Sequence, residues 1–231
     1  MRKLDTRLAL VMSMVPVGAK VCDVGTDHAF LPIHLIQTGK CPSVIASDLR
    51  PGPLKSAEKN VAAAGLQERI ILRLSDGLDQ IAPDETNCII MAGMGGILIT
   101  QIIARTAWVR DTSQHLILQP MTDADVVREF LCLHGFSIIE ERAATAGRHV
   151  YTAMHVIYDG HPPLHDALFF HVGLLPQGGK EEHRWLVKEA KRLRTRSNGL
   201  IQSGRQTDEA AHLANIAGQI EAILHDMEGK I

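Results

Sequence analysis

The sequence predicts an α/β fold, in which a Rossmann-like, seven-stranded sheet is followed by a C-terminal α-helical hairpin. Two patterns support this prediction. Over roughly the first two thirds of the chain, short apolar runs alternate with segments of helical composition, which is typical of βαβ units. Beyond them, apolar residues recur at alternating spacings of three and four, which is typical of two helices packed as an antiparallel coiled coil.

The apolar runs define the expected strands. Five of them alternate with helical segments, and they span residues 20–24, 43–48, 69–72, 87–91 and 115–118. Two more runs, 136–143 and 149–158, are separated only by a short turn at Gly147. Because strands without an intervening helix usually form antiparallel pairs, we expect a hairpin at one edge of the sheet.

We expect two domains, residues 1–160 and 161–231. The turn-rich stretch DGHPPLH separates them. The apolar positions of the first expected helix are Leu186, Ala190, Leu193, Ser197 and Leu200, and those of the second are Leu213, Ile216, Ile220, Ile223 and Met227. Because this spacing suits a hairpin within one chain as well as a dimer, it leaves the oligomeric state open, and we favour a monomer.

Composition restricts the class of protein. The chain has 231 residues, 45% of them hydrophobic and 22% charged, which is ordinary for a globular protein. No window approaches the ~18 apolar residues of a membrane helix, and Asp5 and Arg7 interrupt the N-terminal apolar run, so we expect an amphipathic helix there rather than a signal peptide. The four cysteines form no C-x-x-C pair, which favours a cytoplasmic protein with reduced thiols. No metal site is expected, because no H-E-x-x-H motif occurs.

The expected helical pair is unevenly charged. Residues 180–206 hold eight Lys or Arg against three Glu, whereas 207–231 hold one Lys against five acids. One interpretation is a surface that contacts the phosphates of a nucleic acid, and its candidate residues are Lys188, Lys191, Arg192, Arg194 and Arg196. The alternative is a solvated face that pairs with the acidic second helix. Arg7 is a further phosphate candidate, although it could instead bind a cofactor carboxylate or form a surface ion pair.

The loops after the expected strands carry acids and glycines. The first, DVGTDH, has one glycine, Gly25, and lacks the G-x-G-x-x-G pattern, which disfavours NAD. Its acids Asp23 and Asp27 suit a ligand with a sulfonium and an ammonium group. Asp48, about 20 residues after the glycine loop, can accept hydrogen bonds from ribose hydroxyls, and Asp76-Gly77 can recognise an adenine. The order of these features predicts a site for S-adenosylmethionine.

A glycine-rich stretch, AGMGG at residues 92–96, follows the fourth expected strand. Three glycines in five residues indicate either close approach of a ligand to the backbone or a tight turn packed on a helix. At the carboxyl end of a central strand, this is where we expect the methyl donor and its target to meet.

The motifs DVGTDHAFLP, SDLRPGPLKSAEKNV, MAGMGG and LILQP occur in this order, and together they resemble the bacterial tRNA methyltransferases that modify N1 of adenine 22, the TrmK family. The resemblance covers about residues 4–158, and the helical tail also suits the family. The pair DVGTDHAFLP and MAGMGG is specific, because other methyltransferases often carry a different loop after the fourth strand. The resemblance implies a class I methyltransferase sheet, S-adenosylmethionine as cofactor and tRNA as substrate.

The resemblance also implies roles for individual residues. The expected cofactor-binding residues are Asp23, Gly25, His28, Asp48, Leu49, Asp76, Gly77, Ala92 and Gly93. Asp27 matches the acid proposed as catalytic in the family. Two positions depart from the family pattern, Met121 in place of Asn after LQP and Thr152 in place of Glu after Tyr151. We expect both positions near the substrate side.

The predicted reaction needs alignment more than a base, because N1 of neutral adenine already carries a lone pair. Asp27 is expected to accept a hydrogen bond from the adenine amino group and to support the cationic product; its alternative role is to cap the next helix or bind the cofactor ammonium. Tyr151 or Phe30 is expected either to stack on the exposed base or to pack in the core. The competing hypotheses are a methyltransferase for a small molecule or protein, and a non-catalytic RNA-binding module.

Overall fold

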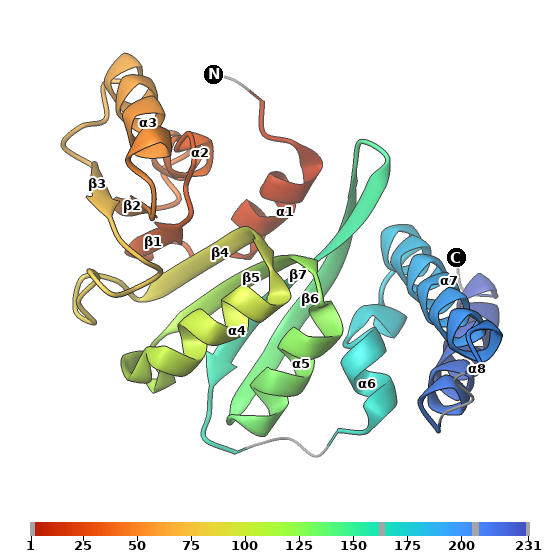
Figure 1. Ribbon diagram of the computed structural model, residues 1–231. Helices are drawn as coiled ribbons and strands as arrows, with labels where there is room; N and C mark the ends of the chain where they lie inside the picture. The colour runs from red at the N-terminus through yellow and green to blue at the C-terminus, as the bar shows by residue number, and fades with distance from the viewer. Residues whose placement is uncertain (1–2, 162–164, 205–207, 230–231) are drawn as a thin grey trace.

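The computed structural model describes residues 3–161, 165–204 and 208–229, so three residues of the expected linker, 162–164, lie outside the described part. One seven-stranded sheet has the order β3-β2-β1-β4-β5-β7-β6 (Figure 1). The strands are β1 (Val21–Val24), β2 (Val44–Asp48), β3 (Ile70–Leu74), β4 (Cys88–Gly95), β5 (His115–Thr122), β6 (Phe136–Ala146) and β7 (His149–Tyr158). Strands β1 to β5 are parallel to one another, and β7 pairs antiparallel with both β5 and β6. The predicted mixed sheet and its edge hairpin are confirmed.

Helices cover both faces of the sheet. Helices α1 (Thr6–Met14), α2 (Phe30–Gln37) and α3 (Pro51–Ala63) pack on one face, and α4 (Gly96–Arg105) and α5 (Ala124–Leu133) pack on the other. Strand β4 shows why both faces are apolar: Cys88 and Ile90 belong to the first core, and Ile89 and Met91 belong to the second. Because successive side chains of a strand point to opposite faces, a continuous apolar run is required.

Strands β4 and β5 extend further than predicted, to Gly95 and Thr122 rather than to residues 91 and 118. The pairing between them is irregular around Gly93, which has a φ of +82°. The glycines and Pro120 that disguised these strand ends in the sequence therefore lie at a bulge, where such residues are common. The two strand ends project beyond β1 and help to form the candidate site.

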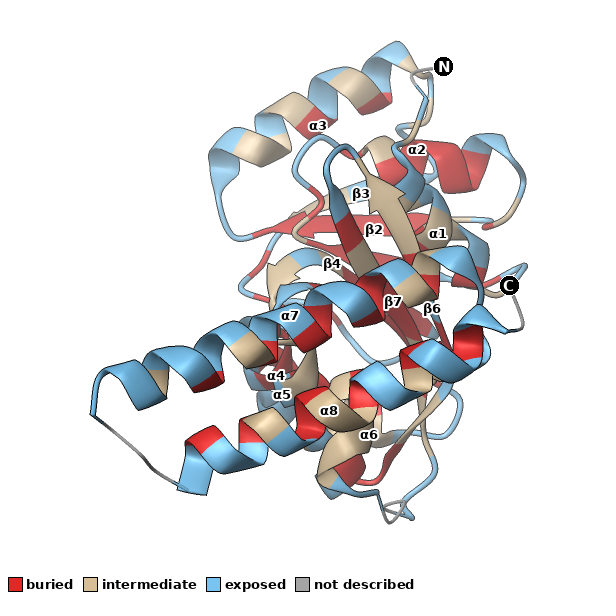
Figure 2. Ribbon diagram, turned by 90° about the vertical axis from the view of Figure 1, so that its right-hand side faces the viewer, coloured by how far each residue is buried: buried red, intermediate tan, exposed pale blue. Residues whose placement is uncertain are grey.

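The C-terminal part contains α6 (Ala167–Val172), α7 (Lys180–Gln202) and α8 (Asp208–Glu228). Helices α7 and α8 pack together along a buried stripe, and a third core joins them to the β6–β7 hairpin through Ala143 and Val150 (Figure 2). The apolar positions predicted from spacing form most of this stripe, and Leu200 and Ile223 are its half-buried members. Helix α6 was not predicted; it is short and lies between α5 and α7 in Figure 1.

Within the described residues, no helix is long and apolar enough to cross a membrane. The four cysteines are buried and unpaired. Burial raises the pKa of Cys22 to about 12 and of Cys41 to about 11, so these thiols remain protonated near neutral pH.

Candidate active site

The loop after β1 turns at Gly25, where φ is +73°. The amides of Gly25 and Thr26 donate to the carbonyl of Ser47 at 2.8 and 2.9 Å, which ties the loop to the end of β2. A Cβ at Gly25 would lie 2.6 Å from Cε of Met94, so that side chain would also have to move. Both the backbone conformation and the approach of Met94 therefore favour glycine.

Two other residues of this loop have left-handed backbones, Asp27 with a φ of 53° and Ala29 with a φ of 57°. Each non-glycine residue in this region costs about 1–3 kcal/mol, and such strain clusters at functional sites. The carboxylate of Asp27 is 65% exposed and lies 3.5 Å from Nε2 of His28. The loop therefore presents a carboxylate and an imidazole side by side at its outer surface.

A pocket of about 230 Å³ opens between this loop, the end of β4 and α1. The predicted site residues that line it are Asp23, Gly25, Asp27, His28, Ala92 and Gly93. Arg7 and Leu8 of α1 line it as well. Residues from three separate elements thus form one cavity at the carboxyl ends of β1 and β4, where the strand order changes direction and where open α/β sheets bind ligands.

Asp23 is the buried acid of the pocket, with 5% of its surface exposed. Burial raises its pKa to about 7, the Thr26 hydroxyl partly offsets this shift, and the nearby Asp48 carboxylate adds to it. A cationic group that enters the pocket would favour the ionised carboxylate and lower the pKa again. The pocket is therefore suited to a ligand with a positive charge close to Asp23.

Asp48 lies at the end of β2, beneath the same loop. Its buried carboxylate accepts hydrogen bonds from the amides of Arg50 at 2.9 Å and Asp27 at 3.4 Å. The next side chain, Leu49, is 61% exposed. Neither residue lines the cavity itself, but Asp48 fixes the backbone of the loop that does. Their predicted contacts with a cofactor stay predictions.

The side chain of Asp76 points toward Arg105 of α4. Arg105 donates to the carboxylate of Asp76 at 2.5 Å and to its carbonyl at 2.8 Å, and the hydrogen bond to the carboxylate lowers the pKa of Asp76. A Cβ at Gly77, where φ is +58°, would lie 2.8 Å from the Arg105 guanidinium and 3.0 Å from Ile102. Asp76 and Gly77 do not line the pocket, so their predicted role in adenine recognition stays a prediction.

Sequence reasoning missed Gln119, although LILQP was among the quoted motifs. Gln119 lies on β5 with none of its surface exposed. Its side-chain oxygen accepts from the Arg7 guanidinium at 2.6 Å and from the amide of Gly93 at 3.1 Å. Its amide nitrogen donates to the carbonyl of Pro120 at 2.9 Å. A polar residue in an otherwise apolar strand was the available signal, because a buried amide requires partners.

Arg7, expected at a phosphate, a cofactor carboxylate or a surface ion pair, lines the cavity beside Gly93. Only 18% of its side chain is exposed, and its guanidinium lies 5.9 Å from the centre of the Tyr151 ring. Its ion-pair partner, Asp5, is 3.7 Å away. The position favours contact with a ligand in the pocket over contact with a distant phosphate.

The five residues of α7 that are nucleic-acid candidates divide into two groups. Three are arginines paired with acids: Arg192 with Glu189 and Asp125, Arg194 with Glu221, and Arg196 with Glu209. Two of these pairs join α7 to α8, as the alternative interpretation of the charge pattern predicted. Lys188 and Lys191 are exposed, and within the described part of the chain no carboxylate lies within salt-bridge distance of them.

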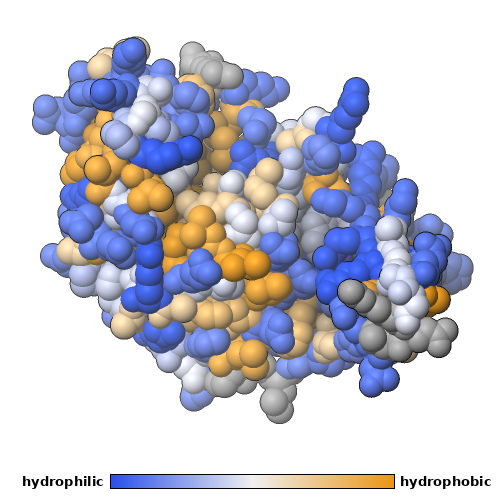
Figure 3. Space-filling view, in the orientation of Figure 1, coloured by the Kyte–Doolittle hydropathy of each residue, from blue (hydrophilic) through white to orange (hydrophobic). Residues whose placement is uncertain are grey.

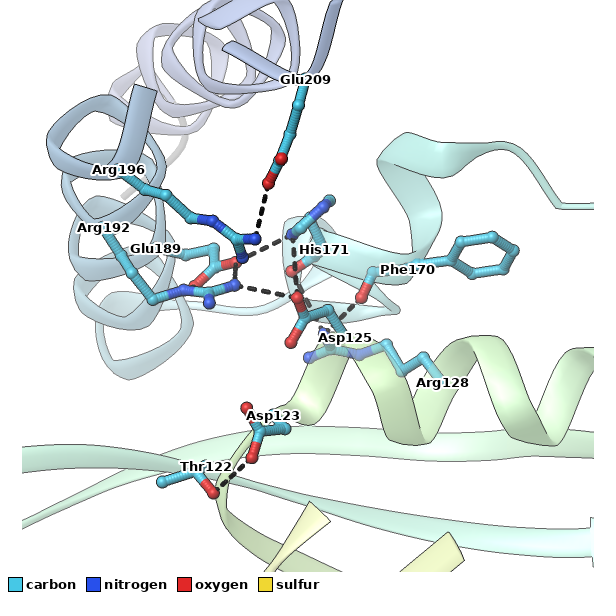
Figure 4. Close-up of polar contacts among 10 residues, drawn as sticks. All are labelled: Thr122, Asp123, Asp125, Arg128, Phe170, His171, Glu189, Arg192, Arg196 and Glu209. Atoms are coloured by element: carbon cyan, nitrogen blue, oxygen red, sulfur yellow. Dashed lines mark hydrogen bonds and ion pairs between the residues drawn. The ribbon is translucent and has the colours of Figure 1, made fainter. Parts of the chain in front are cut away.

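Arg192 belongs to a polar cluster between α5, α6 and α7 (Figure 4). Its guanidinium is 3.0 Å from Asp125 and 2.6 Å from Glu189, and His171 Nδ1 is 2.9 Å from the same Glu189 oxygen. These pairings lower the pKa of Glu189 to about 2 despite its burial. Asp125, His171 and Glu189 have the spacing of a metal site, but Arg192 already supplies a positive charge to both carboxylates.

A second, fully buried ion pair holds the helices to the sheet. Arg128 on α5 pairs with Glu141 on β6 at 2.7 Å, and both side chains are 0% exposed. Arg128 also lies 4.9 Å from the Trp185 ring of α7. The hydroxyl of Thr152 donates to Glu141 at 2.8 Å, so this departure from the family pattern contributes to the interior, and its expected place near the substrate side stays a prediction. Met121, the other departure, is 42% exposed.

The sequence of the chain is similar to those of known methyltransferases. Residues 4–154 match the family model described as a methyltransferase domain. The tRNA (adenine(22)-N(1))-methyltransferase of Bacillus subtilis is 37% identical over 139 residues, which are 60% of this chain and 58% of that protein. The chain thus aligns with little more than half the length of this curated relative.

Solved structures extend the similarity to nearly the whole chain. A Streptococcus pneumoniae protein in complex with S-adenosyl-L-methionine is 34% identical with a TM-score of 0.82, and the match covers 95% of this chain and 98% of that one. The Bacillus subtilis m1A22 tRNA methyltransferase TrmK is 27% identical with a TM-score of 0.82, over 97% of this chain and 98% of that one. The chain belongs to the methyltransferase-domain family and, within it, to the TrmK-type tRNA (adenine-22-N1)-methyltransferases.

Proposed function

We propose that this protein transfers a methyl group from S-adenosylmethionine to N1 of adenine 22 in tRNA. The observation that carries the proposal is the acidic pocket between the β1 loop, the end of β4 and α1, in a chain of this family. The family relation supplies the reaction and the substrate, and the pocket supplies a place for a cationic methyl donor.

The residues of the pocket fit this cofactor. The buried carboxylate of Asp23 can accept hydrogen bonds from its ammonium group, and Arg7, across the cavity, can bind its carboxylate. The absence of a side chain at Gly93 leaves open space in front of the Arg7 guanidinium, 3.5 Å from where a Cβ would stand. When bound, the cofactor supplies an electrophilic methyl group. The ribose and adenine of the cofactor then lie next to the cavity, where they contact Asp48, Leu49, Asp76 and Gly77.

The protein's own groups orient the acceptor and support its charge. N1 of adenine becomes cationic when it is methylated, so a nearby carboxylate stabilises the transition state. Asp27 has that role in this proposal, because its carboxylate is exposed at the mouth of the pocket. The backbone of the loop that carries Asp27 is held at the end of β2 by the hydrogen bonds from Gly25 and Thr26 to Ser47.

Recognition of tRNA requires exposure of a base whose N1 is hidden by pairing, at a cost of a few kcal/mol. Contacts with the phosphate backbone offset this cost. Lys188 and Lys191 are the strongest candidates on α7, because their ammonium groups are free of carboxylates among the described residues. Arg192, Arg194 and Arg196 are already ion-paired and contribute less.

The protein is expected to act in the cytoplasm as a monomer with two domains, residues 1–160 and 161–231. Four unpaired, buried cysteines support a reducing compartment. The apolar stripes of α7 and α8 cover one another within the chain, which removes one reason for these helices to pair with a second copy.

The test is incubation with labelled S-adenosylmethionine and unmodified tRNA, followed by nucleoside analysis and mapping of the modified position. The proposal predicts label in 1-methyladenosine at position 22, and none in a tRNA that carries guanine at that position. Binding of the cofactor without transfer to any tRNA would favour a small-molecule or protein acceptor. If the protein neither binds the cofactor nor transfers a methyl group, the result would favour the non-catalytic RNA-binding module.

A further inference from the structure

A groove of about 310 Å³ lies beside the cofactor pocket, between the β5–α5 turn, β7 and α7. Its walls come from both halves of the molecule, and they are residues 120–125, 150–152, Trp185, Lys188, Glu189 and Arg192. Apolar patches occupy much of the middle of the face seen in Figure 3, and the helices at its right are mainly hydrophilic. The lining of the groove itself combines apolar side chains, such as Met121 and Trp185, with the charged Lys188 and Arg192.

The floor of the groove is one strand away from the cofactor pocket. Ala92 of the pocket pairs with Gln119, and Met94 pairs with Pro120, which lines the groove. Neighbouring strands are about 4.8 Å apart. Gln119 contacts both sides through its bonds to Gly93 and Pro120. An acceptor in the groove therefore lies within reach of a methyl group presented at Ala92–Gly93.

The groove offers what a nucleotide requires. Tyr151 provides an aromatic ring, and Met121 a half-exposed apolar side chain, for contact with a base. Arg192 neutralises Asp125 and Glu189, which leaves Asp123, bonded only to Thr122 among the described side chains, as a carboxylate acceptor near the base. A cationic methylated base would be stabilised by that charge.

We propose that this groove receives the target adenosine, so that α7 forms one wall of the acceptor site rather than only a remote grip on the RNA. The inference rests on the proposed function and adds the place of the substrate. Lys188 contacts the phosphate next to the target, because its ammonium is held at the rim by the carbonyl of Val150 at 3.2 Å. The buried Arg128–Glu141 pair and Trp185 fix α7 in this position.

The chain provides a matched control for the test. Lys188 and Lys180 are both exposed lysines on α7, but only Lys188 lines the groove. Lys188→Gln is expected to lower kcat/KM for tRNA by about tenfold, and Lys180→Gln by less than about twofold at the same salt concentration. Equal losses in the two variants, or none in either, would overturn the assignment. Unchanged thermal unfolding in both verifies that they fold.

A second comparison examines the base contact. Tyr151→Leu is expected to lower kcat/KM by at least about tenfold, whereas Tyr151→Phe, which keeps the ring, stays within about threefold of wild type. A tRNA with 8-azidoadenosine at position 22 should crosslink to the peptide that contains Tyr151 or to the β5–α5 turn. Crosslinks confined to other peptides would overturn the proposal. If wild-type protein methylates no tRNA, it is the proposed function that fails, before any variant is compared.

Discussion

The guanidinium of Arg7 donates a 2.6 Å hydrogen bond to the side-chain oxygen of Gln119, and the two residues are 112 positions apart in the chain. The same oxygen accepts from the amide of Gly93. One buried acceptor therefore joins the N-terminal helix to the bulged end of β4, and the candidate cofactor pocket lies between them.

Replacement of Gln119 by Met should remove both of these hydrogen bonds. The change keeps the volume of the side chain but leaves the amide of Gly93 and the guanidinium without their acceptor, so we expect a loss of about 1–3 kcal/mol in stability. Cofactor affinity should fall by about tenfold, measured by calorimetry. Gln114→Met is the control, because Gln114 is also buried and bonded but lies away from the pocket. It should cost similar stability and leave cofactor affinity unchanged; equal losses of affinity would contradict the prediction.

Asp27→Asn should separate turnover from binding. The substitution removes the charge that supports the cationic product, so kcat should fall by about 100-fold. The dissociation constant of the cofactor should change by less than about threefold, because the buried Asp23 keeps its charge. The measurements are single-turnover kinetics and calorimetry. Parallel losses in both quantities would make Asp27 a cofactor-binding residue instead, and Asp84→Asn on an exposed loop is the inert control.

The stability of the free protein should depend on the ionisation of Asp23. Its pKa is about 7 in the folded state and near 3.8 in the unfolded chain. The folded state therefore holds an extra proton between these values, and the free energy of unfolding contributed by this group falls as pH rises from about 4 to about 7, by up to about 4 kcal/mol. Denaturant unfolding across this range should show the slope, and Asp23→Asn should remove it.

The ionisation of Asp23 should also affect cofactor binding. Ionised Asp23 is the form that accepts from a cofactor ammonium, so affinity should rise as pH increases from about 6 to about 8. Calorimetry in buffers of different ionisation enthalpy should detect a proton released on binding. Proton uptake would show that Asp23 binds the ligand as the neutral acid.

Disruption of the buried ion pair between Arg128 and Glu141 should weaken the packing of the C-terminal helices on the sheet. Glu141→Gln leaves the Arg128 charge buried without a counter-ion, and we expect a loss of about 3–5 kcal/mol. Thermal unfolding measures the loss, and limited proteolysis should show faster cleavage between residues 161 and 180. The double variant Arg128→Met, Glu141→Gln should recover part of the stability, because no unpaired charge remains. A double variant less stable than the single one would contradict this account.

Local sequence patterns predicted much of the fold because they act over few residues. Continuous apolar runs identify strands covered on both faces, and Gly25 follows from a turn that only a left-handed backbone can make. Such patterns, together with the family resemblance, named much of the lining of the candidate cofactor pocket. The extension of β4 and β5 was not, since glycine and proline are typical of loops and only the bulge accommodates them.

Contacts between distant segments were beyond reach of these patterns. Nothing near Gln119 indicates that Arg7 will be its partner. The charge stripe on α7 is visible in the sequence, but whether Arg194 meets Glu221 depends on the register of α7 against α8. The partner of Thr152 could not be predicted for the same reason, because Glu141 lies on the neighbouring strand and Arg128 on α5.

The assembly of the pocket has a consequence for synthesis of the chain. Strand β1 and its loop leave the ribosome early, but Arg7 and Gly93 find their shared acceptor only when residue 119 has emerged and β5 has joined β4. The long-range contact delays formation of the pocket. A nascent chain that ends before β5 should therefore hold no methyl donor, and cofactor capture marks the moment at which β5 has joined β4.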